Sequence, residues 1–153
     1  MEFKGSELIR AGREEVFRFL NDPENFSRGI PDIQEVSVLG PDRFRVIARL
    51  GISMIKSNFT IVFDISERTP PSHVKLRGHG LGSGSAVDLE ITVDLQGGVT
   101  ETALSWSAVA TVSGTLASLG QRVLGAVAER LVREVFGNLH ASLESSGSKP
   151  VTN

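Results

Sequence analysis

Hydrophobic and polar residues alternate along much of the chain between residues 2 and 112. The clearest run is residues 87–95, Val-Asp-Leu-Glu-Ile-Thr-Val-Asp-Leu, in which apolar side chains occupy every second position. A period of two with one polar face is typical of antiparallel strands that are solvated on one side. Similar runs, imperfect in the first, occur at residues 2–10, 36–38, 44–50, 55–65, 74–80 and 104–112. The pattern predicts seven strands, separated by turn sequences such as Gly40-Pro41-Asp42 and Gln96-Gly97-Gly98.

From Thr115 to about Glu144 the spacing of the apolar residues changes to three or four. This spacing predicts one amphipathic helix of about thirty residues, which is roughly 45 Å long at about 1.5 Å per residue. The apolar stripe of this helix consists of Leu116, Gly120, Val123, Val127, Leu131, Val135, Leu139 and Leu143.

Two short helices are expected between the first and second strands. Residues 13–20 have apolar side chains at helical spacing. Asp22-Pro23 then provides an N-cap followed by proline at the first helical position, which starts a second helix over about residues 23–28. Gly29 ends this helix. Because Ile30-Pro31 would place its end at an edge of the sheet, we expect it to lie outside the main core.

The architecture follows from what each element must bury. Seven strands form a sheet with one apolar face, and one long helix must cover that face. The sequence therefore predicts an α+β, helix-grip fold, in which a curved seven-stranded antiparallel sheet grips a long C-terminal helix. The chain of 153 residues has the length of one domain, which we expect to cover residues 1–144. Residues 145–153 are small and polar and are expected to be a disordered tail.

Small residues are frequent where the helix and the sheet should meet. The helix contains Ala117, Gly120, Gly125, Ala126 and Ala128, and the facing strands contain Gly78, Gly80, Ala108 and Ala110. A glycine inside a helix lowers helix stability by about 1 kcal/mol relative to alanine, so we expect a structural reason for each helix glycine. One reason is close packing between helix and sheet, and the other is space for a ligand. The number of these residues and the scarcity of inward polar groups favour a cavity, because ligand pockets are mostly apolar.

The predicted cavity has expected walls and an expected gate. The lining residues would be Phe26, Ile30, Phe44, Val46, Phe59, Ile61, Trp106, Leu119 and Val123. Trp106 would either pack in the core or stack on a ring-shaped ligand. Pro31 and the glycines Gly80, Gly82 and Gly84 would form the gate, because glycine gives a hairpin its greatest backbone freedom.

Composition excludes several classes of protein. The chain has no cysteine, so it can form neither a disulfide nor a thiolate metal site. Its 16 basic and 18 acidic residues give a net charge of −2, which provides no electrostatic footprint for nucleic acid. The first residues contain no apolar run, so we expect no secretory signal, and no segment is long and apolar enough to span a bilayer. We expect a soluble, cytoplasmic protein.

Few residues could support catalysis or hold a cofactor. His73, His79 and His140 do not have the spacing of metal ligands, so no metal is expected. The glycine-rich segment 78–84 lacks the lysine of a phosphate-binding loop and precedes a strand, so it predicts a hairpin rather than a nucleotide site. Glu7 is the one carboxylate that could face inward, where it would act as an acid or base; otherwise it reaches water at the strand end.

Several segments resemble the G subunits of carbon monoxide dehydrogenase, which form a family within the START-like (SRPBCC) superfamily. The resemblance extends over about residues 2–143 and is carried by the order and spacing of six motifs. These are Phe3-Lys4-Gly5, the run from Val16-Phe17 to Asp22-Pro23, Ile30-Pro31, the hairpin Gly80–Gly84, the segment Gly114–Gly120 and Phe136-x-x-Leu139. The chain departs from the family pattern at Gly29, where cysteine is frequent, and at Glu7, where an apolar residue is frequent.

The resemblance implies the helix-grip fold and an accessory role to a molybdenum hydroxylase-type dehydrogenase, with a quinone or other lipid as ligand and peripheral contact at the inner face of the membrane. Our leading hypothesis is a non-catalytic carrier of an apolar small molecule, with no other cofactor. The alternatives are a START-like cyclase or hydrolase that uses Glu7, and a structural adaptor with a filled core. The sequence leaves open whether the protein is a monomer or a homodimer.

Overall fold

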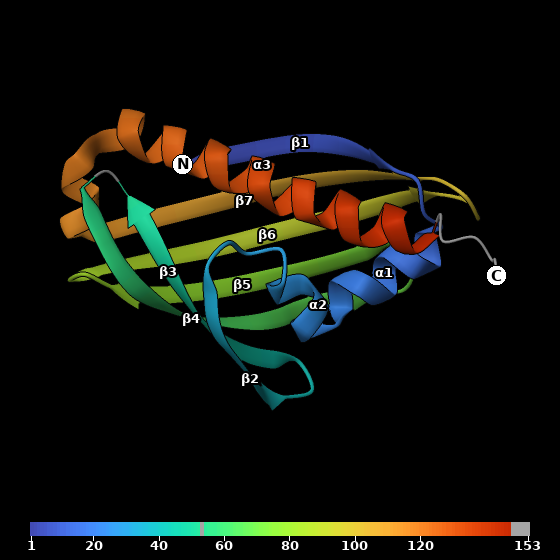
Figure 1. The fold of residues 1–153 in the computed structure, drawn as a ribbon, viewed down its shortest axis with the longest axis horizontal. Coiled ribbons are helices and arrows are strands. Elements are labelled where there is room, and N and C mark those ends of the chain that lie inside the picture. Colours follow the sequence, from blue (N-terminus) through green and yellow to red (C-terminus); the bar gives the residue numbers. More distant parts are fainter. Residues whose placement is uncertain (53, 148–153) are drawn as a thin grey trace.

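A computed structural model of the chain, which describes residues 1–52 and 54–147, contains one seven-stranded antiparallel sheet (Figure 1). The strands run in the order β1-β7-β6-β5-β4-β3-β2 across the sheet. Their bounds are β1 Glu2–Ile9, β2 Ile33–Gly40, β3 Arg43–Ile52, β4 Ile55–Thr69, β5 His73–Gly82, β6 Ser85–Gly97 and β7 Thr102–Gly114. The predicted fold class is confirmed, and consecutive strands from β2 to β7 are joined as neighbouring antiparallel pairs.

Among the described residues, three α-helices and one 3₁₀ helix complete the fold. They are α1 Arg13–Asn21, α2 Pro23–Ser27, the 3₁₀ helix η1 Thr115–Leu119 and α3 Gly120–Gly147. Figure 1 shows α3 crossing one face of the sheet, with α1 and α2 near its C-terminal half. The predicted cap of α2 is present, since the Asp22 carboxylate accepts a hydrogen bond of 3.0 Å from the backbone N–H of Glu24.

The long C-terminal helix differs from its prediction at both ends. The chain from Thr115 first forms η1, and the α-helix starts at Gly120. Gly114 and Gly120 have φ angles of 81° and 87°, a region that favours glycine, and these two residues separate β7, η1 and α3. The helix ends at Gly147, so the first three residues of the predicted tail are helical, and residues 148–153 lie outside the described residues.

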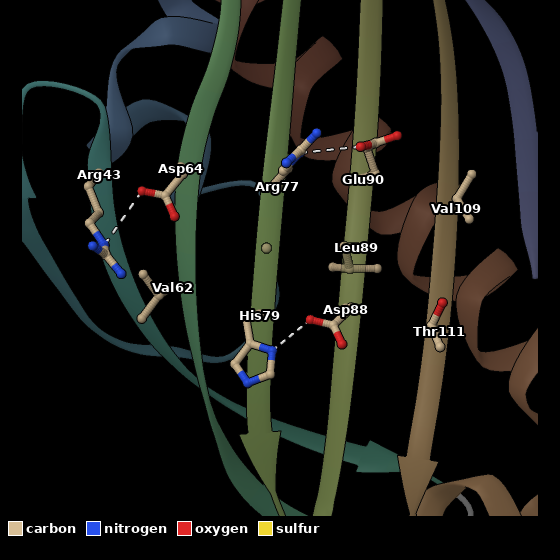
Figure 2. Close-up of a pocket in the computed structure, with 11 residues that line it drawn as sticks. Arg43, Val62, Asp64, Arg77, His79, Asp88, Leu89, Glu90, Val109 and Thr111 are labelled. Carbon is tan, nitrogen blue, oxygen red and sulfur yellow. Dashed lines mark hydrogen bonds and ion pairs between the residues drawn. The ribbon is translucent and has the colours of Figure 1, made fainter.

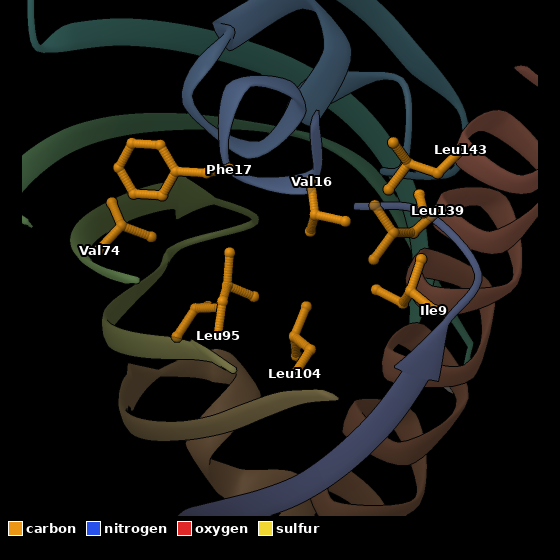
Figure 3. Packing of buried hydrophobic residues seen from close by; sticks show 10 residues of the cluster. Ile9, Val16, Phe17, Val74, Leu95, Leu104, Leu139 and Leu143 are labelled. Carbon is orange, nitrogen blue, oxygen red and sulfur yellow. The ribbon is translucent and has the colours of Figure 1, made fainter. Parts of the chain in front are cut away.

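The core consists of three clusters of buried apolar side chains. The first joins α1, β1 and the end of α3, and includes Ile9, Val16, Leu104, Leu139 and Leu143, each at most 5% exposed (Figure 3). The second is centred on Phe44, Phe63 and Leu76. The third, at the β3–β4 end, contains Ile52, Phe59 and Leu116.

Helix α2 packs against the second core cluster through Phe26, although Ile30-Pro31 predicted it to lie outside the main core. Its Phe26 packs edge-on against Phe44 and Phe63, with ring centroids 5.9 and 5.6 Å apart. Phe44 and Phe63 are themselves stacked with centroids 5.2 Å apart. The short helix therefore supplies one ring of a three-ring aromatic cluster, a geometry that adds to simple burial.

Candidate functional site

The covered face of the sheet is not evenly buried. On strands β4, β6 and β7, six inward side chains remain only partly buried: Ile61, Val87, Leu89, Ile91, Ala108 and Val112. We call this set the central apolar face. By contrast, Phe44 and Val46 on β3, one strand from the edge of the sheet, are 1% and 0% exposed. A helix that pressed evenly on the sheet would bury the central strands at least as well as β3. The incomplete burial of these six side chains favours space between α3 and strands β4, β6 and β7, whereas Leu76, Gly78 and Gly80 on the middle strand β5 are buried.

The small residues divide into two groups with different roles. On β5, a Cβ atom at Gly78 would lie 3.0 Å from the Phe63 ring, and one at Gly80 would lie 3.2 Å from Ile61. These two glycines therefore allow close packing of their neighbours. On α3, a Cβ atom at Gly120 or Gly125 would meet no atom within 4 Å. Because Gly120 is exposed, the open space beside it is solvent. The packing interpretation therefore holds for β5, and the cavity interpretation for the helix remains a prediction.

The residues predicted to line a pocket are spread over all three core clusters. Phe44, Val46 and Phe59 are at most 3% exposed and lie inside the core. Phe26, Ile30, Trp106 and Leu119 are partly buried at the edges of their clusters. Ile61 belongs to the central apolar face, and Val123 on α3 is 36% exposed. Trp106 packs against Phe136, with ring centroids 5.7 Å apart. Whether these residues contact a ligand remains a prediction.

Five members of the central apolar face are not among the pocket residues predicted from the sequence: Val87, Leu89, Ile91, Ala108 and Val112. Their alternation with polar residues places them correctly on the inward face of their strands. The alternation does not depend on the distance between α3 and each strand. It therefore could not distinguish these five partly buried residues from the fully buried inward residues.

The predicted gate residues occupy regular backbone. Gly82 pairs with Ser85 across a two-residue turn whose residues, Ser83 and Gly84, have φ angles of 51° and 69°. Positive φ at both central residues is typical of the tight hairpin turn that suits twisted strands. The turn packs against η1, since Ser85 Oγ accepts a hydrogen bond of 2.8 Å from the Leu116 backbone N–H. Pro31, the fourth predicted gate residue, lies after α2 and not in this hairpin. The gating role of these residues remains a prediction.

Glu7 faces inward and forms part of a cluster that joins β1 to α3. It lies on the same face of β1 as the fully buried Ile9. Its Oε1 lies 2.8 Å from Nε2 of His140, and Nδ1 of His140 lies 3.0 Å from Oε2 of Glu144. The backbone N–H of Arg10 donates a further hydrogen bond of 3.0 Å to Glu144. The imidazole of His140 contacts a carboxylate on each side, and its contact with Glu7 connects the end of α3 to the edge strand β1.

The charges in this cluster stabilise one another. The hydrogen bond to Glu7 raises the pKa of His140, burial opposes the rise, and Glu144 adds to it. The backbone N–H of Arg10, followed by His140, lowers the pKa of Glu144. Because the folded pKa of His140 lies above its ordinary value of 6.5, the stability that it contributes is fully present below pH 6.5. That contribution is lost as the pH rises through the folded pKa.

This linkage gives a prediction for Glu7→Gln. The substitution should lower the titration midpoint of His140 toward 6.5 and reduce the fall in unfolding free energy above that pH. The measurement is an NMR titration of the three histidine imidazoles. His73 is the internal control, because hydrogen bonds to Asp94 and Glu67 raise its pKa elsewhere on the sheet. A His140 midpoint that did not move would contradict the assigned contact.

A charged hollow lies on the opposite, outer face of the sheet (Figure 2). Its volume is about 640 Å³, and its walls carry the pairs Arg43–Asp64, Arg77–Glu90 and His79–Asp88 at 3.5, 3.3 and 2.7 Å. A second hollow of about 490 Å³ is lined largely by polar residues of β1, β6 and β7. Both are broadly open to solvent, so neither encloses an apolar ligand as a space under α3 would.

Residues 1–52 and 54–147 contain no group of three acidic or histidine side chains that could hold a metal ion. In the same part of the chain, no helix combines the length and hydrophobicity needed to cross a bilayer.

The sheet order, the gripping helix and the two short helices define a START-like, helix-grip protein. A START superfamily protein from Mycobacterium smegmatis superposes with a TM-score of 0.75 at 12% identity, over 94% of this chain and 97% of that one. The Zhui aromatase/cyclase from Streptomyces sp. R1128 gives a TM-score of 0.64 at 16% identity, over 94% and 93% of the chains. At these identities the likeness concerns the fold alone.

Sequence comparison identifies the family. Residues 5–144 match the family of the carbon monoxide dehydrogenase G subunit (CoxG), and the chain belongs to this family. A conserved protein from Geobacillus kaustophilus has a similar structure, with a TM-score of 0.88 and 28% identity over 95% of this chain and 97% of that one. Among curated protein sequences, none matches the chain.

Proposed function

We propose that this protein binds an apolar small molecule between α3 and the central apolar face, as a non-catalytic carrier. The supporting observation is the incomplete burial of six inward apolar side chains on β4, β6 and β7. Covering such a surface contributes about 25 cal/mol for each Å² of apolar area removed from water. A ligand would therefore be held mainly by its apolar area.

Family membership supports a more specific role. The family is named after a component of carbon monoxide dehydrogenase, so a molybdenum hydroxylase-type dehydrogenase is the proposed partner. In this role the protein delivers or holds a quinone or another lipid for that enzyme. We propose a cytoplasmic location with peripheral contact at the membrane, where such a ligand is available.

The experiment that tests binding begins with the ligand itself. Purified protein is extracted with organic solvent, and the released molecules are identified by mass spectrometry. Adding the released molecule back should change the emission of Trp106, the only tryptophan, in a saturable way. Nile red, a neutral apolar dye, should bind to the extracted protein and be displaced by the same molecule. If nothing is released and no dye binds, the core is filled and the protein is a structural adaptor.

One observation favours a second candidate function. Glu7 faces inward and is hydrogen-bonded to His140, an arrangement that could transfer a proton. We therefore propose, as the alternative, a START-like cyclase or hydrolase acting on an apolar substrate. Any turnover found with the extracted ligand should vanish in Glu7→Gln if this alternative holds. Binding without turnover, unaffected by the same substitution, supports the carrier.

A further inference from the structure

Residues 23–31, which contain α2 and the turn after it, make few polar contacts with the rest of the molecule. Apart from the bonds to the cap residue Asp22, their hydrogen bonds are internal, such as that from the Ile30 N–H to the Ser27 carbonyl. Among the described residues, one further hydrogen bond leaves the segment: Nδ2 of Asn138 on α3 donates to the Gly29 carbonyl at 3.2 Å. No ion pair in the same part of the chain involves residues 23–31.

Apolar contacts provide the main attachment of this segment. The Phe26 ring packs edge-on against Phe44 and Phe63 in the second core cluster. Ile61 and Ile91, two members of the central apolar face, pack against the same cluster. Displacing Phe26 would therefore uncover the part of the core that adjoins the central apolar face.

Ser27 reduces the stability of the seated segment. It is 0% exposed, and its hydroxyl is the one buried side-chain oxygen or nitrogen without a hydrogen-bond partner in the part of the chain that the structure describes. A buried hydroxyl without a partner has lost its bonds to water and gained none in return, which costs free energy. Moving the segment outward would return this hydroxyl to water, so the unpaired group favours opening.

Both ends of the segment are held in place. At one end, the Asp22 N–H donates to the Phe19 carbonyl of α1 at 3.3 Å. At the other end, Asp32 has a φ angle of 54°, and its carbonyl accepts a hydrogen bond of 2.9 Å from the Arg49 N–H on β3. A segment with fixed ends and a weakly held middle can move as a unit about a few terminal residues.

The β5–β6 turn, which contains the other predicted gate residues, is held more firmly. Besides the bond from Leu116 to Ser85, the Thr115 N–H donates to the Gly84 carbonyl at 3.3 Å. Two hydrogen bonds thus join this short turn to η1. Of the two predicted gate regions, residues 23–31 are therefore the one with the weaker attachment.

We infer that residues 23–31 form a lid, which moves about Asp22 and Asp32, lifts Phe26 out of the aromatic cluster and admits an apolar ligand to the central apolar face. This inference rests on the proposed function and adds its route of entry. The lid is closed in this structure, with Phe26 seated on Phe44 and Phe63. A ligand enters during openings, so its association rate follows the population of the open state.

The test locks the lid with a disulfide. The chain has no cysteine, and a Cβ atom at Gly29 would lie 3.7 Å from Cγ1 of Val135 on α3, a spacing that suits a disulfide. The full-length variant G29C/V135C, extracted with solvent, is mixed with Nile red in a stopped-flow fluorimeter. Oxidised protein should bind and release the dye at least about tenfold more slowly than the same protein reduced with dithiothreitol. The Kd should change little, because locking a lid slows entry and exit together.

The two single variants, G29C and V135C, control for the side-chain changes, and a thiol titration shows whether the disulfide has formed. Equal rates in the disulfide-bonded and reduced protein would overturn the lid and leave the proposed function intact. If the parent protein binds no Nile red, the proposed function itself fails.

A second arm needs no disulfide and decides the matter if the two cysteines stay reduced. Asn138→Ala removes the hydrogen bond between the lid and α3, so dye association should become about two- to tenfold faster, the factor that one hydrogen bond contributes to an equilibrium. Gln121→Ala, another exposed amide on α3, is the matched control and should leave the rate unchanged. An unchanged rate in Asn138→Ala, or an equal rise in the control, would contradict the lid.

Ser27→Ala should have the opposite effect. The closed lid would no longer bury an unpaired hydroxyl, so the open population should fall and dye association should become slower. The same substitution should raise the melting temperature. Faster or unchanged association in Ser27→Ala would count against the lid.

Discussion

Ala108→Phe is expected to weaken the binding of an apolar dye such as Nile red by at least about tenfold. Ala108 belongs to the central apolar face and lies between Ile91 and Phe3 in register, so a ring added there projects into the space below α3. Displacing about 60 Å² of ligand contact at about 25 cal/mol/Å² costs about 1.5 kcal/mol, which corresponds to roughly a tenfold change in Kd. Fluorescence titration of the folded variant measures this change.

The neighbouring residue provides the control. Val109 points to the outer face of the same strand and is 44% exposed. Val109→Phe adds a ring to the same strand but not to the covered face, so it should leave dye affinity unchanged. If both variants bound the dye as the parent protein does, any ligand would bind somewhere other than the central apolar face.

Phe44→Ala is expected to lower the unfolding free energy by about 3–5 kcal/mol, because it removes a buried ring and leaves a cavity. Phe44 is 1% exposed and contacts the rings of both Phe26 and Phe63. A loss of this size is a large part of the roughly 5–15 kcal/mol by which a domain is typically stable. Urea unfolding followed by circular dichroism measures it, with the slope against denaturant showing whether unfolding remains two-state.

Val38 gives a matched comparison for this variant. It lies opposite Phe44 in the β2–β3 register but is 59% exposed. Val38→Ala should therefore change stability by about 0.5 kcal/mol or less. Similar losses in the two variants would mean that the aromatic cluster contributes little. Phe44→Leu, which retains most of the volume, should fall between them.

Local sequence patterns were enough to predict the strands, their faces and the existence of the gripping helix. Residues 87–94 show why: a period of two assigns each side chain to one face, and the structure pairs these residues in unbroken register with both neighbouring strands. The Asp22-Pro23 cap is equally local, because it depends on a few consecutive residues. Such features follow from the backbone geometry of short segments.

The boundaries of the C-terminal helix were harder to predict from the sequence. The apolar spacing of residues 115–144 fits one helix, but the chain divides it at Gly120 into η1 and α3. The division coincides with contacts that η1 makes to the β5–β6 turn, where Ser85 accepts from Leu116, 31 residues away. Apolar spacing predicts which side of a helix is apolar. It does not predict where contacts with distant strands interrupt the helix.

Which inward residues form a site depends on tertiary packing. Glu7 and His140 are 133 residues apart in sequence but form a hydrogen bond. No local motif around either residue predicts this contact. Phe26 is part of an aromatic cluster through rings on β3 and β4. The burial of each inward residue depends on the height of α3 above its strand. Such distances arise from the packing of segments far apart in the chain, so no local pattern of residues encodes them.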